Sequence, residues 1–265
     1  MKKIPLFAII IAALWVITQS TGCKKVLDYI VHHPDGLASK CRIERIIGNY
    51  RTYLIDDSEE GVVVTDTAFF FYNAQGNPVR VEHPFSKADW RISSFDDAFG
   101  YDESGRLKAS MEAVNPTENY ADEWHYYTYV NSHLIIDTTF YYVNDDWRIK
   151  NRPEFYSYYR VSTIELDNFE RIIKETDSGG FVTTYSYDQN GNLIKPGVTY
   201  TNKTSILQTN KVWMFLARDY SVNSPEGSAT KYNQFKLPVK LNYLPSTWPQ
   251  AVPTHPGISV NYQCN

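Results

Sequence analysis

Cysteine and histidine are scarce in this chain, and so are the motifs that would gather them into a site. The 265 residues include three cysteines and six histidines. No CxxC or HExxH motif sets them at zinc-ligand spacing, so we expect no metal and no cofactor. The G-x-S-x-G nucleophile elbow and the phosphate-binding P-loop are missing as well. The net charge of −4 disfavours a nucleic-acid partner, which requires a basic surface.

Apolar runs long enough to span a membrane as a helix are also missing, and the longest apolar run lies near the start of the chain. Lys2 and Lys3 precede an apolar stretch over residues 4–17, which is too short for a transmembrane helix but typical of an export signal. The segment STGC then ends at Cys23 and resembles the lipobox of bacterial lipoproteins. This resemblance implies that residues 1–22 are a signal peptide and that Cys23 carries the lipid. An ordinary secretory signal with an incidental cysteine is the alternative.

The predicted lipid anchor indicates the cellular location of the protein. We expect an exported protein attached to the membrane through its lipid, in the outer membrane of a Gram-negative bacterium. Residues 23–40 would form a tether, and residues 41–264 one β domain. Two cysteines are then left in an oxidising compartment, which favours a disulfide between Cys41 and Cys264. Two unpaired buried thiols are the alternative.

Aromatic residues, by contrast, are abundant. The chain has 21 Tyr, 13 Phe and 6 Trp, and such residues fit the pleated surface of a β-sheet. Strand-like segments recur from residue 41 to about residue 205, separated by turn signals. Residues 206–217 break this pattern: the spacing of Ile206, Trp213 and Ala217 predicts a short helix with one buried side. We expect that helix to cap an open end of the sheet, and a further buried strand is the alternative.

One short phrase recurs along the chain: Tyr, then Asp or Asn, two free positions and Gly. It reads YNAQGN at 72–77, YDESGR at 101–106 and YDQNGN at 187–192, with a degenerate copy, LDNFER, at 166–171. The Asp or Asn is expected to accept backbone N–H groups, and the glycine to take the left-handed conformation of a hairpin loop with a G1 bulge. Hairpins are therefore predicted at 73–76, 102–105, 167–170 and 188–191. The turn-forming residues are Asn73, Gly76, Asp102, Gly105, Asp167, Asp188 and Gly191. Glu170 stands in place of glycine, so that copy should be strained by about 1 kcal/mol.

These phrases resemble YD repeats, the units of RHS-type shells, and more closely those of smaller YD-repeat lipoproteins of the cell envelope. The resemblance implies an all-β fold, an antiparallel meander of hairpins that forms one elongated or sandwich-like domain over residues 41–264. The glycine-equivalent positions 76, 105, 170 and 191 lie 29, 65 and 21 residues apart. Because this array is short and irregular, the enclosing function of the shells is not carried over.

The functional hypothesis rests on the aromatic strands between the turns. Alternate rings on a strand face opposite sides, so a strip of rings is expected on whichever face is not the core. Such rings can stack on sugars or grip a protein. The candidate residues are Trp124, Tyr127, Tyr129, Tyr141 and Trp147. We therefore expect a non-enzymatic binding or structural module that presents its sheet to a glycan or an envelope protein. Rings that are buried on both faces and only stabilise the sheet are the alternative.

Acidic residues supply a second hypothesis, a glycan hydrolase. Acid pairs occur at 59–60, 96–97 and 145–146, and a glycosidase requires two carboxylates about 5–10 Å apart. Neighbouring residues on a strand face opposite sides, so none of these pairs is predicted to be catalytic. Two carboxylates from different strands, together in a cleft beside an exposed Trp, would favour the hydrolase.

Overall fold

The computed structural model describes residues 41–52, 62–83, 96–115, 120–141, 158–244 and 257–264. The predicted signal peptide, the tether, Cys23 and Trp147 lie outside these ranges. Within them, no helix is long and apolar enough to cross a membrane.

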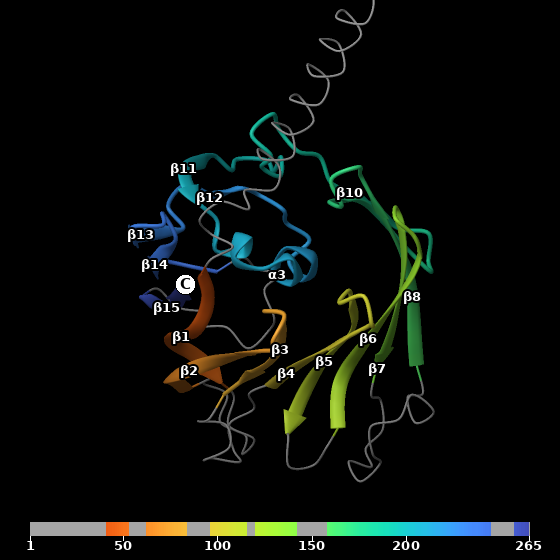
Figure 1. Cartoon of the computed structure of the whole chain (residues 1–265), viewed down its shortest axis with the longest axis horizontal. Helices are drawn as coiled ribbons and strands as arrows, with labels where there is room; N and C mark the ends of the chain where they lie inside the picture. Colours follow the sequence, from red (N-terminus) through yellow and green to blue (C-terminus); the bar gives the residue numbers. More distant parts are fainter. Residues whose placement is uncertain are drawn as a thin grey trace, which may run out of the picture.

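Thirteen strands form one antiparallel sheet, and almost all neighbours along the chain are also neighbours in the sheet (Figure 1). The all-β meander predicted from the repeats is therefore confirmed. A separate pair is formed by β11 (Tyr200–Thr204) and β12 (Asn223–Pro225). In spatial order the large sheet consists of β10 (Val182–Thr184), β9 (Ile172–Asp177), β8 (Tyr158–Leu166), β7 (Leu134–Tyr141), β6 (Tyr120–Asn131), β5 (Leu107–Asn115), β4 (Asp96–Tyr101), β3 (Pro78–Glu82), β2 (Val62–Tyr72), β1 (Cys41–Thr52), β15 (Ile258–Cys264), β14 (Pro238–Leu241) and β13 (Ala229–Tyr232).

The last strand of the chain pairs with the first. Cys41 lies directly opposite Cys264 in the β1–β15 register, and a disulfide joins the two residues. The predicted bridge is thus present in the structure. It closes a loop with a sequence separation of 223 residues and fixes β1 and β15 to each other where β1 begins and β15 ends.

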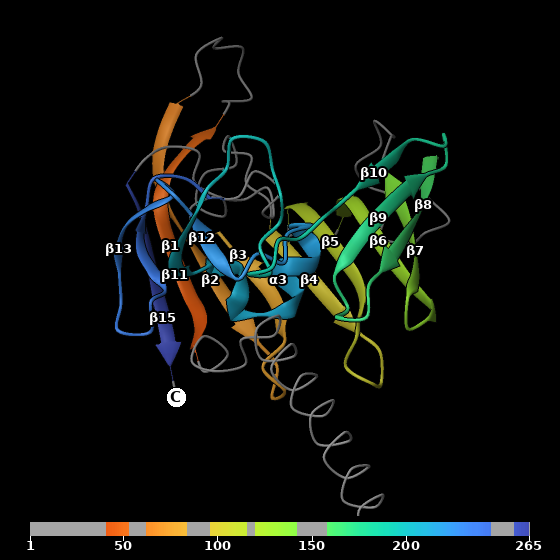
Figure 2. The same cartoon turned by 90° about the horizontal axis from the view of Figure 1, so that it is seen from above.

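The sheet curves, and a short helical segment lies on its concave side (Figures 1 and 2). This segment consists of the 3-10 turn η3 (Ile206–Thr209) and the helix α3 (Lys211–Leu216). The hydroxyl of Ser205 caps η3, and the side-chain oxygen of Asn210 caps α3 by accepting the N–H of Val212 at 2.9 Å. The helix predicted over 206–217 is therefore present. It does not cap an open end of the sheet: it lies on the concave face, where its residues Val212, Trp213 and Phe215 are buried.

Trp213 is the centre of this core. Its side chain is fully buried and makes edge-to-face contacts with Phe70 and Phe99, each at 5.5 Å between ring centroids. Phe215 packs in the same way on Tyr127 at 5.0 Å. Strand alternation decides which rings take part: Phe70 faces α3, whereas its neighbour Phe71 is 39% exposed on the convex side.

All four predicted hairpin turns adopt the expected conformation. The left-handed residue has a φ of 83° at Gly76, 79° at Gly105, 61° at Glu170 and 78° at Gly191. At Asp102, one carboxylate oxygen accepts the backbone N–H groups of Ser104 at 3.0 Å and Arg106 at 2.9 Å. The backbone N–H of Arg106, together with the hydroxyl of Ser104 at 2.8 Å, holds the pKa of the Asp102 carboxyl down at about 2. The pairing register shifts just after the turn, as a bulge requires.

Two further turns of the same kind are present that the sequence did not predict. Asp177 accepts the N–H groups of Gly179 and Phe181, and Asn233 accepts those of Phe235 and Leu237. Their left-handed residues are Gly180, with a φ of 80°, and Lys236, with a φ of 63°. The signal for the second was present in the text YNQFKLP at 232–238, which begins like YNAQGNP at 72–78. Lysine in place of glycine obscured it.

Tyrosine hydroxyls connect successive turns. In each case the fifth residue after the Asp or Asn of a turn offers its backbone carbonyl to a tyrosine on the next segment of the meander. Two of these donors, Tyr101 and Tyr187, are the tyrosines that begin predicted turn phrases. The pairs are Tyr101 with Pro78, Tyr129 with Leu107, Tyr187 with Ile172, Tyr200 with Leu193 and Tyr262 with Pro238. We call this set the tyrosine ladder.

Candidate functional site

The structure divides the predicted ring residues between the two faces of the sheet. Tyr127, Tyr129 and Tyr141 face the concave side, and Trp124 faces the convex side, where it lies opposite Phe140. The expected single strip is therefore not formed by these residues. Tyr127 is only 3% exposed and lies beneath Phe215, so its ring is not available on a surface. The sequence did not show that α3 would cover this part of the concave face.

Tyr127 and Tyr129 have structural hydrogen bonds. The Tyr127 hydroxyl lies 3.1 Å from that of Ser110, and burial raises the pKa of this phenol. The Tyr129 hydroxyl donates to the carbonyl of Leu107 at 3.0 Å, and burial raises its pKa to about 12. Both phenols therefore stay neutral at physiological pH.

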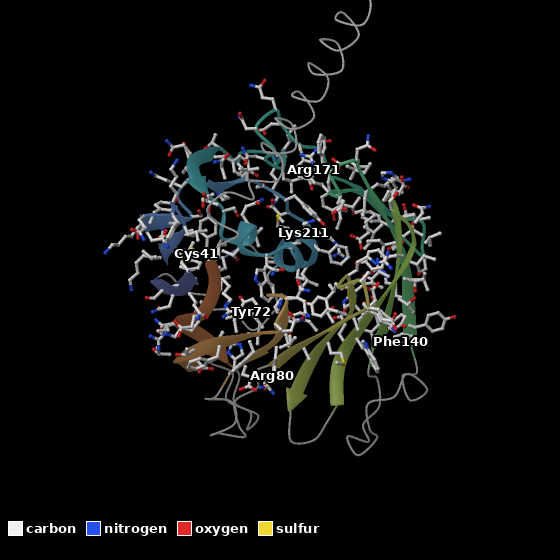
Figure 3. All side chains as sticks on the ribbon, in the orientation of Figure 1. Cys41, Tyr72, Arg80, Phe140, Arg171 and Lys211 are labelled. Atoms are coloured by element: carbon white, nitrogen blue, oxygen red, sulfur yellow. A yellow bond between two sulfur atoms is a disulfide. The ribbon has the colours of Figure 1, made fainter. Side chains whose placement is uncertain are left out.

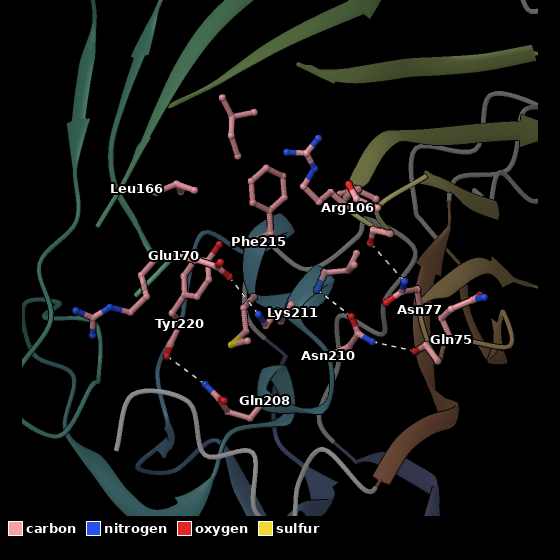
Figure 4. A pocket seen from close by; sticks show the side chains of 18 of the residues that line it. Gln75, Asn77, Arg106, Leu166, Glu170, Gln208, Asn210, Lys211, Phe215 and Tyr220 are labelled. Atoms are coloured by element: carbon pink, nitrogen blue, oxygen red, sulfur yellow. Dashed lines mark hydrogen bonds and ion pairs between the residues drawn. The ribbon is translucent and has the colours of Figure 1, made fainter. Parts of the chain in front are cut away.

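A groove of about 960 Å³ lies between three hairpin tips and the helical segment (Figure 4). We call it the tip groove. The tips at 73–77, 102–106 and 167–171 form one side, and η3 with the start of α3 forms the other. Its apolar lining includes Leu107, Ile135, Leu166 and Phe215. Concave sites of this size with mixed lining are the usual location of ligand binding.

Hydrogen bonds hold the two sides of the tip groove at a fixed distance. The side-chain amide of Asn210 donates to the carbonyl of Gly76 at 3.1 Å, which ties the start of α3 to the first tip. The ammonium of Lys211 lies 3.1 Å from the carboxylate of Glu170 on the third tip. Figure 4 shows both contacts as dashed lines. The groove is therefore preformed.

Most of the cations that line the tip groove are paired with acidic side chains of the hairpin tips. Arg106 is paired with Asp102 at 2.8 Å, Arg171 with Asp167 at 2.7 Å, and Lys211 with Glu170. The fourth cation, Arg42, donates two hydrogen bonds to the side-chain carbonyl of Gln263. The groove thus presents little net charge to a ligand.

Aromatic rings and side-chain amides supply most of the remaining surface. The rings of Tyr129, Phe169 and Tyr220 line the groove, and the guanidinium of Arg106 lies 4.4 Å from the centre of the Tyr129 ring. The side chains of Gln75 and Asn77 come from the first tip. Rings pack on the apolar faces of a ligand and amides bond its hydroxyl groups, so this lining suits a neutral, hydroxyl-rich molecule.

A second polar group of residues lies on the concave face, between β6, β7 and β9. His125 contacts Asp137 at 3.0 Å and Glu123 at 3.1 Å. Burial alone would lower the pKa of His125, but the hydrogen bonds and charges of these two acids raise it to about 9. Arg218, just after α3, contacts Asp137 at 3.4 Å and Glu175 at 3.2 Å. We call these five residues the ionic cluster.

Of the predicted acid pairs, only Asp96 and Asp97 lie among the described residues, and both are buried. Asp96 accepts the backbone N–H of His83 at 2.9 Å. In the part of the chain that the structure covers, no group of three or more His, Cys, Asp or Glu side chains is placed to hold a metal ion.

Comparison with known proteins supports the repeat and little else. Residues 171–205 match the family model of the RHS repeat, and this segment includes the turn at 188–191. The resemblance of the turn phrases to YD repeats is therefore confirmed over that segment, which is compatible with an exported or envelope protein. No curated protein is significantly similar to the chain.

Among solved structures, a porin-like protein from Bacteroides uniformis is similar to 84% of this chain and 98% of its own. The identity is 12% and the TM-score 0.26, and a likeness at this level carries no argument about function.

From the sequence alone, the turn phrases are predicted only to connect strands. In the structure Gln75, Ser104 and Phe169 line the tip groove, and all three occupy the second free position of their turns. This shared position in the turn phrase is a sequence signal for the groove residues. It identifies them only once the structure shows that three tips gather around one helical segment.

Proposed function

We propose that the chain is a lipid-anchored, non-enzymatic binding module of the cell envelope that takes up a glycan in the tip groove. The single observation behind this proposal is the preformed groove of about 960 Å³. Rings and side-chain amides line it, and most of its cations are paired with acids of the hairpin tips. The Cys23 lipobox and the export signal support the location, in the outer membrane of a Gram-negative bacterium. A protein partner that inserts a polar loop into the groove is the alternative ligand.

Binding is tested with the whole chain in detergent on an array of envelope and plant-type oligosaccharides, followed by calorimetry on the best ligand. Gln75→Ala and Phe169→Ala should each weaken that binding about tenfold, which corresponds to about 1.4 kcal/mol. Asn190→Ala is the matched control, since Asn190 holds the same turn position at a tip that does not line the groove. Equal affinity for the control and both groove variants would exclude the tip groove as the binding site.

The anchor is tested separately by mass spectrometry of the membrane fraction. We expect an N-terminal peptide that begins at Cys23 and carries acyl chains. Cys23→Ser should release the protein from the membrane without changing glycan affinity, because the groove is built from residues beyond position 41. An unmodified Cys23 in the membrane fraction contradicts the lipoprotein assignment.

A hydrolase is the second candidate, and the ionic cluster is the observation that favours it. Glu123, Asp137 and Glu175 come from three different strands and gather on the concave face. Their partners oppose this function, because a general acid must carry a proton and Asp137 receives bonds from both His125 and Arg218. Release of reducing sugar that disappears in both Asp137→Asn and Glu175→Gln, while both variants stay folded, would establish hydrolysis.

A further inference from the structure

The two edges of the large sheet differ in how they are protected. β13 and β10 are its outermost strands, and they lie at opposite ends of the curved sheet (Figures 1 and 2). An edge strand offers unpaired backbone groups to other chains, and lysine side chains on it discourage such pairing. β13 carries an exposed lysine, Lys231. β10, with the sequence Val182-Thr183-Thr184, has no charged residue, and all three of its side chains are exposed.

Exposed apolar side chains surround the edge of β10. Phe181, directly before the strand, is 73% exposed, and Val182 is 47% exposed. Ile194 lies beyond the other end of the strand, where its backbone N–H donates to the carbonyl of Ser186 at 2.8 Å, and its side chain is 61% exposed. None of the three lines the tip groove. Figure 3 draws them among the side chains at the β10 end of the sheet. Apolar side chains gathered beside an uncharged strand edge mark an interaction site.

The pairing of β10 with β9 determines which of its backbone groups point outward. The N–H of Tyr185 donates to the carbonyl of Ile173 at 2.8 Å, so Tyr185 directs its backbone groups toward β9. In an antiparallel ladder this direction alternates along the strand, so Thr183 also bonds toward β9. Val182 and Thr184 therefore direct their N–H and C=O groups away from β9. On that side no further strand lies within the part of the chain that the structure describes.

We propose that β10 pairs with β10 of a second copy of this chain, antiparallel and about a two-fold axis at Thr183. In that register Val182 of each copy exchanges both backbone hydrogen bonds with Thr184 of the other, so the outward groups of the strand are paired. Thr183 lies opposite Thr183 of the second copy, and cross-strand threonine pairs are favourable. Phe181 lies opposite Tyr185 of the second copy, and this pair covers the exposed Phe181 ring.

The charges beside β10 favour a second copy as the partner. A two-fold contact requires a surface that complements itself. β10 brings no charged residue to the axis, so no like charges meet there. On β9, Glu175 lies opposite Thr183 and is paired with Arg218 at 3.2 Å, and Lys174 is paired with Glu165 at 2.7 Å. An acidic or basic strand from another protein would find no unpaired charge here to recognise.

Thr183→Cys tests the register by cross-linking. Opposite residues of a non-hydrogen-bonded pair have Cα atoms about 4.5 Å apart, which is within the range of a disulfide. The whole chain, in detergent with micelles in excess over protein, should form a covalent dimer under mild oxidation, seen on a non-reducing gel. Thr230→Cys is the matched control, because Thr230 is an exposed threonine on the other edge strand, β13. The yield of dimer should be at least tenfold higher for Thr183→Cys, and the native chain gives the background from Cys23.

Thr183→Lys tests the same contact without a covalent bond. It places two ammonium groups directly opposite each other, and like charges in that position are destabilising. Sedimentation equilibrium should show a monomer–dimer equilibrium for the native chain and a dimer Kd at least tenfold higher for Thr183→Lys. Thr230→Lys should leave the Kd unchanged. Circular dichroism identifies a variant that fails to fold, in which case the yield of Thr183→Cys dimer decides.

Three results overturn the proposal. The first is a native chain that stays monomeric at millimolar concentration. The second is a dimer that Thr183→Lys leaves intact, or that Thr230→Lys weakens equally, which would assign the contact to another surface. The third is a Thr183→Cys chain that bonds to its own Cys23, which would assign the edge of β10 to the N-terminal segment of the same chain. None of these measurements involves a glycan, so this proposal and the tip groove can fail separately.

Discussion

Tyr187→Phe tests the tyrosine ladder with the removal of a single oxygen atom. The Tyr187 hydroxyl donates to the carbonyl of Ile172 at 3.0 Å, and Ile172 is fully buried. Phenylalanine keeps the ring, its edge-to-face contact with Tyr220 and the stacking of the Arg171 guanidinium, which lies 4.1 Å from the ring centre. The change therefore isolates the hydrogen bond.

Two effects set the size of the loss. A hydrogen bond of this kind contributes about 1 kcal/mol net, and a buried carbonyl left without a partner raises the cost to about 1–3 kcal/mol. We expect the free energy of unfolding to fall by about 1–2 kcal/mol. For a domain of this size each kcal/mol lowers Tm by about 2–4 °C.

Urea denaturation followed by circular dichroism, with the disulfide intact, gives the free energy of unfolding directly. Tyr159→Phe is the control, because that hydroxyl lies on a residue that is 63% exposed. Tyr101→Phe, at another step of the ladder, should resemble Tyr187→Phe, and the double variant should show additive losses because the two bonds share no partner. If Tyr187→Phe and Tyr159→Phe unfold at the same urea concentration, the ladder does not stabilise the fold.

Three further predictions concern the turns, the disulfide and the ionic cluster. Gly105→Ala should lower the free energy of unfolding by about 1 kcal/mol, because alanine is strained at a φ of +79°. Steric contact adds nothing, since the new Cβ meets no atom closer than Asn77 at 3.8 Å. Gly100→Ala, within a strand, is the control and should show no such loss. Replacing both bridge cysteines with serine should lower it by about 5 kcal/mol on the loop-entropy estimate for 223 residues, and an unchanged urea midpoint would contradict this. The pKa of His125 is raised to about 9, so the stability that its charged form adds to the folded protein is complete below the unfolded pKa near 6.5 and is lost as the pH rises through 9. The free energy of unfolding of His125→Gln should therefore fall less between about pH 7 and pH 9.5 than that of the native chain.

The turns could be predicted from the sequence because their conformation is local. Asp or Asn bonds backbone N–H groups two and four residues ahead, and the left-handed residue follows at a fixed distance. This reasoning located Gly76, Gly105 and Gly191 and identified Glu170 as a left-handed residue without glycine. The turn at Lys236 was not predicted, because lysine stands there in place of the expected glycine, as glutamate does at Glu170.

The site could not be predicted in the same way, because its residues depend on contacts between distant segments. Gln75, Ser104 and Phe169 come together only because the sheet curves around η3 and α3. Curvature and helix docking follow from the summed packing of Trp213 and its neighbours, which no short window of sequence contains.

The sequence by itself determined the turns, since they rest on local hydrogen bonding. It favoured the Cys41–Cys264 bridge over two free thiols and the short helix over a further strand, and the structure decided both. Only the tertiary structure decided which rings are buried. Tyr127 and Trp124 are three residues apart and equally aromatic, yet Phe215 of α3 packs on the first, while the second lies on the opposite, convex face of the sheet. The physical reason is that alternation assigns side chains to two faces, whereas the curvature of the sheet and the position of one helix decide which face is the core.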